Sequence, residues 1–400
     1  MRIGFGAPVS GAWATPGGLA RFAAQAEAAG YGSLWTFQRL LVPEGSAMEP
    51  VYHSVLDPMV ALGYAAAVTS RIRLGVAVVN MPYLSPAYLA KQAASVDVLS
   101  GGRLDLGLGL GWMPEEFTAA EAAGYGSLWT FQRLLVPEGS AMEPVYHSVL
   151  DPMVALGYAA AVTSRIRLGV AVVNMPYLSP AYLAKQAASV DVLSGGRLDL
   201  GLGLGWMPEE FAAADAVMAG RGARTGEYIE VMRRLWAGGV TEFRGGHYTV
   251  PPGRAAPLPV QRPGPPVLLG GTVPKALQRV GRLADGWVTS SRTDLSRIRE
   301  GIDVVRAAAA GAGRDPGALR VICRGVVRWG APVTVPEGGG RVPLSGSFDD
   351  IRADIAWLAE QGVTEVFYDL NWDPQVGTPE IAPQAAADRA GQILAELAPR

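Results

Sequence analysis

The sequence predicts an α/β fold, a (β/α)₈ TIM barrel, and three observations lead to this prediction. Short apolar runs alternate with helix-like segments along most of the chain, which indicates a parallel sheet covered by helices. Residues 26–117 and 120–211 are identical at every position. Counted without one copy, the chain has eight predicted strands and 306 of its 400 residues, a usual size for one barrel. The other copy is therefore surplus to the barrel.

The N-terminal unit and the repeated block supply the first four strands. An apolar run over 2–7 predicts a strand, and Thr15 before Pro16 predicts the start of a helix that ends at Gly30. Thr caps helix starts, Pro fits the first turn and Gly fits the residue after the last turn. The block continues the alternation, with strands expected at 33–37, 73–79 and 104–109 and helices beginning at Asp57-Pro58 and Ser85-Pro86.

The segment after the second copy supplies the remaining four strands. Apolar spacing predicts a helix over 224–236, and alternating residues predict a hairpin over 242–250. The Gly/Pro-rich segments 251–266 and 330–346 are expected to be long loops, which in a barrel often lie over the active face. Strands are expected at 267–269, 286–290, 319–327 and 365–370, and helices are expected to begin near Thr272, Thr293, Ser347 and Thr378.

The identity of the two copies bears on how the chain is organised. Functional repeats diverge because each unit meets different neighbours, so identity over 92 residues points to a recent tandem duplication or a sequence-assembly error. Eleven strands, the count with both copies, do not match eight-stranded closure. We expect a single barrel domain over 1–400, in which one copy fills the barrel and the other packs outside it or is poorly ordered. The sequence does not decide which copy does which.

Composition excludes several classes of function. A formal net charge of -2 leaves no basic surplus to bind nucleic acid or anionic lipid. No window reaches the roughly 18 apolar residues that a membrane span needs, and no leader pattern opens the chain, so a cytoplasmic protein is expected. The three histidines, His53, His147 and His247, lack metal-ligand spacing, so no metal is expected. The lone Cys323 lies in a predicted strand and is interpreted as a core residue.

Segments that follow predicted strands are the candidates for a binding site, because barrel active sites lie at the C-terminal strand ends. After the strand at 267–269, Gly270 and Gly271 precede a helix start, which suits a phosphate, although a plain turn is the alternative. The segment 106–117 and its twin 200–211 carry glycines at every second position. These glycines either leave room for a planar ring or relieve packing. The glutamates of this segment follow a proline at a helix start, where capping is favoured over catalysis, at Glu115, Glu116, Glu209 and Glu210.

Taken in order, several segments resemble the luciferase-like monooxygenase superfamily, and the pattern is nearer to its F420-dependent branch than to bacterial luciferases. Each segment is a weak signal alone, but together they span nearly the whole chain apart from the extra copy. They are AAGYGSLW at 28–35, IRLGV at 72–76, the stretch from 85 to 117, GEYIEVMRRLW at 226–236, FRGGHY at 243–248, and LLGGTVPKAL at 268–277 with LADGW at 283–287.

This resemblance implies a barrel that binds coenzyme F420, with FMN as the alternative. The cofactor phosphate would lie near Gly270, Gly271 and Thr272, and its ring against the third and fourth strand ends. A non-proline cis peptide is implied in the third strand, and an asparagine at the end of that strand either contacts the ring or forms a turn. The residues concerned are Ala77, Val78 and Asn80 in the first copy, Ala171, Val172 and Asn174 in the second, and Trp206 after the fourth strand.

Two departures from the family pattern limit the mechanism. Where many F420-dependent relatives have Asp-His, this chain has Gln38-Arg39 and Gln132-Arg133, so the acid-base histidine is missing. These four residues are the catalytic candidates. Either arginine would hold an anionic group of the cofactor or substrate, or else be a structural arginine facing outward. Trp112 or Trp206 stands where sugar-phosphate dehydrogenase relatives have a glutamate, which argues against a glucose-6-phosphate dehydrogenase.

The leading functional hypothesis is hydride transfer between F420 and a small organic substrate, in which the cofactor supplies the chemistry. The first alternative is an FMN-dependent monooxygenase served by a separate flavin reductase. The second is an inactive product of gene duplication, in which the extra copy disturbs barrel closure. Relatives are commonly dimers, and a homodimer is one of the oligomeric states that the sequence leaves open.

Overall fold

The two larger parallel sheets of the computed structural model, with their helices, make up most of the described chain. The seven-stranded sheet has the order β15-β12-β11-β10-β7-β6-β5, and the smaller one has the order β1-β2-β4. The structure describes residues 4–37, 42–43, 54–76, 86–105, 121, 124–138, 149–330, 332–334, 340–370, 373, 375–376 and 381–398.

The seven-stranded sheet is nearly closed into a barrel, which confirms the predicted fold class. All of its neighbouring strands run parallel. The second copy of the repeat supplies three of them, β5 (Ser127–Thr130), β6 (Arg167–Asn174) and β7 (Leu198–Gly203). The later chain supplies β10 (Val267–Gly270), β11 (Gly286–Val288), β12 (Arg320–Val326) and β15 (Glu365–Asp369).

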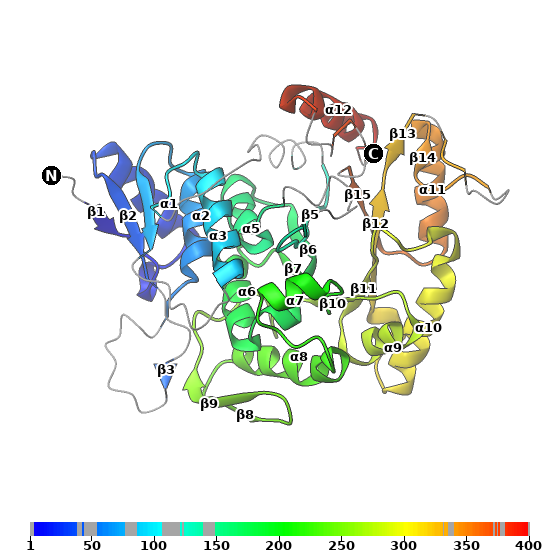
Figure 1. Ribbon diagram of the computed structural model, residues 1–400, viewed down its shortest axis with the longest axis horizontal. Helices are drawn as coiled ribbons and strands as arrows, with labels where there is room; N and C mark the ends of the chain where they lie inside the picture. The colour runs from blue at the N-terminus through cyan, green and yellow to red at the C-terminus, as the bar shows by residue number, and fades with distance from the viewer. Residues whose placement is uncertain are drawn as a thin grey trace.

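The helices that follow these strands lie around the barrel (Figure 1). The apolar side chains that cover the outer face of the sheet form one large cluster with the helices, and a smaller cluster around Ala171, Leu268 and Ile322 lies inside the barrel. The helices are α5 (Pro152–Val162), α6 (Pro180–Ser194), α7 (Pro208–Ala213), α8 (Arg221–Ala237), α9 (Pro274–Leu283), α10 (Ile298–Gly311), α11 (Phe348–Glu360) and α12 (Pro383–Glu396).

Most helices begin where the capping signals of the sequence predict. The Asp151 carboxylate accepts a hydrogen bond from the backbone N-H of Val154 at 2.9 Å, and Ser179 accepts one from Tyr182 at 3.2 Å. Each capping residue is followed by a proline at the first helical position. Ser347 and Asp350 form a complete capping box at the start of α11. These local contacts explain why the helix starts are legible in the sequence.

The first copy packs outside the barrel, as one of the two predicted arrangements has it. Its elements are β2 (Ser33–Thr36), α2 (Pro58–Ala67), β4 (Arg73–Val76) and α3 (Pro86–Leu99). Together with β1 (Gly4–Gly6) and α1 (Pro16–Ala28), they form the layer at the left of Figure 1. Their apolar side chains form a hydrophobic cluster that also includes Val154 and Tyr158 of α5.

The two copies meet through identical helices. A Cβ atom added to Gly63 of α2 would lie 2.9 Å from the Val154 carbonyl oxygen, and one added to Gly157 of α5 would lie 2.8 Å from that of Val60. The backbone N-H of Asp57 donates to Ser189 Oγ at 2.7 Å, and that of Asp151 donates to Ser95 Oγ. Each contact is thus matched by its twin, as at an interface between two copies of one surface.

The prediction of eight barrel strands is wrong for β1. This strand pairs with β2, in the register Gly4 to Ser33 and Gly6 to Trp35, and not with the identical strand β5. Between Gly6 and Ser33 lie 26 residues, against 120 between Gly6 and Ser127, so loop closure favours β2 by only about 1 kcal/mol. The short right-handed connection through α1 also favours the neighbouring strand. Because β2 is nearer to β1 along the chain than β5 is, β1 pairs with β2 and lies outside the barrel.

Other predicted elements differ only in their limits or fall outside the described residues. The predicted hairpin is present as β8 (Thr241–Arg244) and β9 (Thr249–Arg254), and β3 (Val42–Pro43) pairs with β9. Within the expected loop 330–346, β14 (Ser345–Gly346) pairs with β13 (Arg328–Trp329). The end of the predicted strand 73–79, most of 104–109 and the predicted helix start at Thr378 lie outside the described residues. In the described part of the chain, no helix is long and apolar enough to cross a membrane.

Candidate functional site

A cavity of about 540 Å³ lies at the C-terminal ends of the barrel strands, within the size range of small-molecule sites. Strands β6, β7, β10, β11 and β12 all contribute to its lining. The second-copy and later candidates from the sequence come together here, namely Gln132, Arg133, Ala171, Val172, Asn174, Trp206, Gly270, Gly271 and Thr272. Their first-copy twins Gln38, Arg39, Ala77, Val78 and Asn80, together with Trp112, lie outside the described residues.

The loop between β10 and α9 has the features of an anion-binding turn. A Cβ atom at Gly271 would lie only 2.5 Å from the Ala276 Cβ, so only glycine fits this close approach. Trp287 Nε1 donates to the Gly271 carbonyl at 2.9 Å and holds the loop in place. No side chain caps the start of α9, which leaves its first N-H groups available to an anion. Ser290, Ser291 and Arg292 line the same part of the cavity.

The end of β6 forms another part of the cavity wall. The peptide bond between Ala171 and Val172 is cis, as the resemblance implied. A Cβ atom at Gly203 would lie 2.4 Å from Val172 Cγ2, and one at Gly201 would lie 2.0 Å from the Val170 oxygen. Of the two readings of the alternating glycines, packing relief therefore applies to Gly201 and Gly203.

Asn174 joins three segments of the cavity rim. Its backbone N-H donates to Gln132 Oε1 at 2.8 Å, and its side-chain Oδ1 accepts from the backbone N-H of Gly205 at 3.0 Å. Gly205 has a φ of 68°, a conformation that favours glycine. Asn174 thus ties the ends of β6 and β7 to the loop after β5 and shapes the rim.

Arg133 is buried and paired, so the alternative of a structural arginine that faces outward is wrong for this residue. Its Nη1 lies 2.9 Å from Glu210 Oε2, and the two side chains are only 7% and 1% exposed. The Leu134 backbone N-H and the Tyr177 hydroxyl also donate to Glu210, at 2.6 and 3.2 Å. Burial, with the adjacent Glu210 charge, raises the pKa of Tyr177 above its ordinary value. Glu210 is therefore the anchor of the cavity wall and not only a helix-start carboxylate, whereas Glu209 stays exposed.

Two arginines that the sequence analysis did not single out also line the cavity, besides Arg292. Arg324, near the end of β12, pairs with Asp369 at 2.7 Å, and its guanidinium lies 4.9 Å from the centre of the Phe131 ring. Arg221 lines the cavity from the start of α8. An arginine inside an otherwise apolar strand, as in Val-Ile-Cys-Arg-Gly-Val at 321–326, is the signal that could have revealed Arg324.

Three residues that line the cavity carry buried hydrogen-bond donors that the described residues do not satisfy. Gln132 Nε2, Arg221 Nε and Arg324 Nη2 are buried and have no hydrogen-bond partner in the described part of the chain. Trp206, 53% exposed, offers an aromatic face at the rim, with the guanidinium of Arg133 5.4 Å from its centre. Unmet donors beside an uncapped helix start fit an anionic, planar ligand with acceptor atoms. The residues present therefore fit F420 or FMN.

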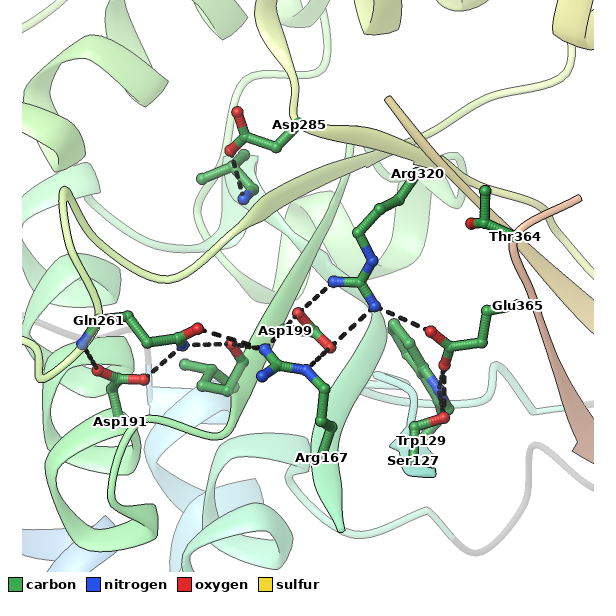
Figure 2. A network of polar contacts seen from close by, with 12 residues as sticks. Ser127, Trp129, Arg167, Asp191, Asp199, Gln261, Asp285, Arg320, Thr364 and Glu365 are labelled. Carbon is green, nitrogen blue, oxygen red and sulfur yellow. Dashed lines mark hydrogen bonds and ion pairs between the residues drawn. The ribbon is translucent and has the colours of Figure 1, made fainter. Parts of the chain in front are cut away.

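The opposite end of the barrel is filled by a polar network (Figure 2). Arg167 and Arg320 both bond the Asp199 carboxylate, at 2.7 and 2.6 Å, and Arg320 reaches Glu365 at 2.9 Å. Burial acts to raise the pKa of Asp199, but the bonds from the two arginines outweigh it and lower that pKa. Because Asp199 and Glu365 both have arginine partners and Asp191 accepts hydrogen bonds from Gln261, we assign this network a structural role.

Comparisons with known proteins agree with this geometry. A family model described as luciferase-like monooxygenase matches the chain twice, at residues 3–119 and 113–332, so that each match contains one copy. The uncharacterized protein Rv0953c of Mycobacterium tuberculosis is 34% identical over 262 residues, which cover 65% of this chain and 81% of that protein.

Two solved structures share the fold. The monooxygenase RslO1 from Streptomyces bottropensis superposes with a TM-score of 0.56 at 23% identity, covering 71% of this chain and 92% of its own. The F420-dependent tetrahydromethanopterin reductase from Methanopyrus kandleri gives a TM-score of 0.56 at 16% identity, covering 72% and 94%.

Proposed function

Since the chain belongs to the luciferase-like monooxygenase family, we propose that it is an oxidoreductase that transfers hydride between coenzyme F420 and a small organic substrate. The observation that carries the proposal is the cavity at the barrel mouth, which is lined both by an uncapped helix start and by residues with buried donors that lack partners in the described residues. An F420-dependent reductase among the structural neighbours supports the choice of cofactor.

The residues divide into a phosphate end and a ring end. Gly270, Gly271 and Thr272 would hold the cofactor phosphate through backbone N-H groups, with Arg292 nearby to balance its charge. Gln132 and Arg324 would donate to carbonyl acceptors of the ring or the substrate. When bound, F420 supplies the hydride-carrying carbon, and the protein supplies position and charge.

Arg133 acts as a binding and positioning residue in this proposal. Its ion pair with Glu210 fixes the guanidinium in place, and arginine side chains serve in proteins to bind anions, not to transfer protons. Gln132 does not titrate. The reaction that suits these residues is therefore a hydride transfer in which neither Gln132 nor Arg133 moves a proton. The proton that accompanies the hydride would then be exchanged with water or with a group of the substrate itself.

An FMN-dependent monooxygenase with a separate flavin reductase is the second candidate. It is favoured by the likeness to the monooxygenase RslO1 and by the same phosphate-binding loop, which does not distinguish the two cofactors. A third candidate is an inactive product of duplication, favoured by the absence of β1 from the seven-stranded sheet.

Fluorescence titration with F420 and, separately, with FMN distinguishes these candidates. The matched control is a variant that lacks the 94 residues 26–119, in which α1 continues directly into the second copy. We expect both forms to bind F420. Tighter binding of FMN would overturn the cofactor assignment, and binding by the deletion variant alone would support the inactive product.

A further inference from the structure

A gap runs through the barrel wall between β5 and β15, the two edge strands of the seven-stranded sheet. A cavity of about 410 Å³ lies in this gap. Successive residues of a strand point to opposite faces, so Trp129 faces the barrel interior and Leu128 faces outward. Both residues line the cavity, as do Phe367 and Val366 on the other side. The cavity therefore passes through the wall.

Among the described residues, side chains make the contacts that join the two edges of the gap. The Trp129 ring stacks on Phe367 with centroids 5.0 Å apart, and Ser127 and Trp129 donate to Glu365 (Figure 2). In the described residues, no backbone ladder pairs β5 with β15. Edge strands with free N-H and C=O groups are templates for a further strand. The gap thus offers two such templates that face each other.

The strand that fits this gap is β1, because its present partner has the same sequence as β5. Strands β2 and β5 both read Ser-Leu-Trp-Thr, within the 92 identical residues. Every backbone partner that β1 uses on β2 is therefore repeated on β5. In the gap, β1 would also have β15 on its other side, whereas in the small sheet, among the described strands, it pairs with β2 alone.

Phe5 provides a second, independent match. This residue is 42% exposed in its present position, where its ring makes T-shaped contacts with Phe22 and Tyr31. Its register partner on β2 is Leu34, whose twin on β5 is Leu128. Leu128 lies in the outward part of the gap cavity, together with the apolar residues Val366, Ile393 and Leu394. The same register on β5 would bury the Phe5 side chain among these residues.

The β1 strand of the same molecule cannot reach the gap while the first copy stays docked. Four residues, 29–32, connect α1 to β2, and such a segment spans at most about 14 Å. In Figure 1 the small sheet and β5 lie on opposite sides of the layer formed by α2, α3 and α5. The donor of the strand must then be another molecule.

We propose that the gap between β5 and β15 is a docking site for β1 and α1 of a second copy of this chain, so that the protein self-associates by strand exchange. The inserted strand completes an eight-stranded barrel in the acceptor. In the donor, β1 and α1 leave β2. Two chains that exchange reciprocally form a closed dimer, and one-way exchange forms longer assemblies.

Disulfide trapping tests the proposal directly. One chain carries Gly4→Cys and another carries Ser127→Cys, both with Cys323→Ala, and the two are refolded together and oxidised. Gly4 now pairs with Ser33, so the chain with Gly4→Cys and Ser33→Cys is the control for the observed pairing. We expect a covalent heterodimer on a non-reducing gel. No heterodimer, with closure of the control pair, would overturn the proposal. Closure within a single chain that carries both Gly4→Cys and Ser127→Cys would also overturn it.

Light scattering over a wide range of protein concentration gives a second test with the natural chain. We expect concentration-dependent association, weakened at least about tenfold by Phe5→Asp, because the new charge would be buried in an apolar site. Trp13→Asp is the matched control, since Trp13 is 51% exposed and also contacts Phe22 but lies outside β1. A monomer at every concentration, or equal weakening by both substitutions, would contradict strand exchange.

Discussion

The two copies of the repeat have one sequence but two environments. Asp105 and its twin Asp199 show how the environment changes burial and ion pairing. Asp105 is 29% exposed and pairs with Arg73. Asp199 is fully buried and pairs both with Arg167, the twin of Arg73, and with Arg320 of β12. The local partner is thus the same in both copies, and the partner from a distant strand is present in one only. Local contacts are a property of the segment, whereas a buried network is a property of its neighbours.

The largest expected effect is on this pair of twins. Asp199→Ala removes the fully buried carboxylate that Arg167 and Arg320 share, while Arg320 keeps Glu365 and both arginines are partly exposed. We expect it to lower the free energy of unfolding by about 3 kcal/mol. Asp105→Ala breaks an ion pair that is partly exposed, and we expect a loss of at most about 1 kcal/mol. Urea unfolding of both variants measures the difference. Equal losses would show that the two copies have equivalent surroundings.

The contact between the copies should depend on pH. Burial raises the pKa of Asp151 to about 6, and the nearby Asp57 adds to this, although bonds from Val154 and Tyr88 and the charge of Lys91 oppose it. A raised folded-state pKa means that the native protein binds the proton more tightly, so stability falls as pH rises from about 4 to about 6. Burial likewise raises the pKa of Asp57.

Asp151→Asn tests this expectation, because asparagine keeps the helix cap and does not titrate. We expect it to raise the free energy of unfolding at pH 7.5 by up to about 3 kcal/mol, with little effect near pH 4. Denaturation at the two pH values provides the measurement. A substitution that stabilises equally at both would contradict the assigned pKa.

Replacing the same uncharged residue in each copy should change the affinity for the cofactor in one copy only. Gln132 lines the cavity with an unpaired Nε2, so Gln132→Leu should weaken F420 binding about tenfold, the value of roughly one hydrogen bond. Its twin variant, Gln38→Leu, should bind as the natural chain does. Fluorescence titration compares them, with the unfolding midpoint of each as the control for folding. A tenfold loss in the Gln38 variant would mean that the first copy builds the site.

The smallest effect should be the same in both copies. Glu27 accepts hydrogen bonds from the backbone N-H groups of Ser70 and Ile72, and its twin Glu121 accepts the same bonds from Ser164 and Ile166. Burial acts to raise the pKa of Glu27, but the backbone hydrogen bonds prevail and lower it to about 2. Replacing either glutamate by glutamine should cost at most about 1 kcal/mol, measured by urea unfolding. Unlike losses would refute a purely local origin.

The sequence predicts what depends on neighbours along the chain. Thr15, Asp151 and Ser179 mark helix starts because the donors that they cap lie three residues away. The turn at Gly270 and Gly271 is legible for the same reason. The pairing of β1 with β2 was not predicted, because two identical strands compete for β1 and chain connectivity decides between them.

The candidate site was predicted in part. Alignment to a family pattern places Gln132, Asn174 and Trp206 in one cavity, but no local pattern shows that Glu210 reaches Arg133 across 77 residues. Arg324 and Asp369 are likewise brought together only by the pairing of β12 with β15.

The central claim is that the second copy, and not the first, forms the cofactor site. A crystal structure of the full chain with F420 bound tests it most directly. Our account predicts the cofactor phosphate at Gly270, Gly271 and Thr272, and its ring beside Gln132 and Val172. A cofactor held by the first copy, against Gln38 and Val78, would contradict it.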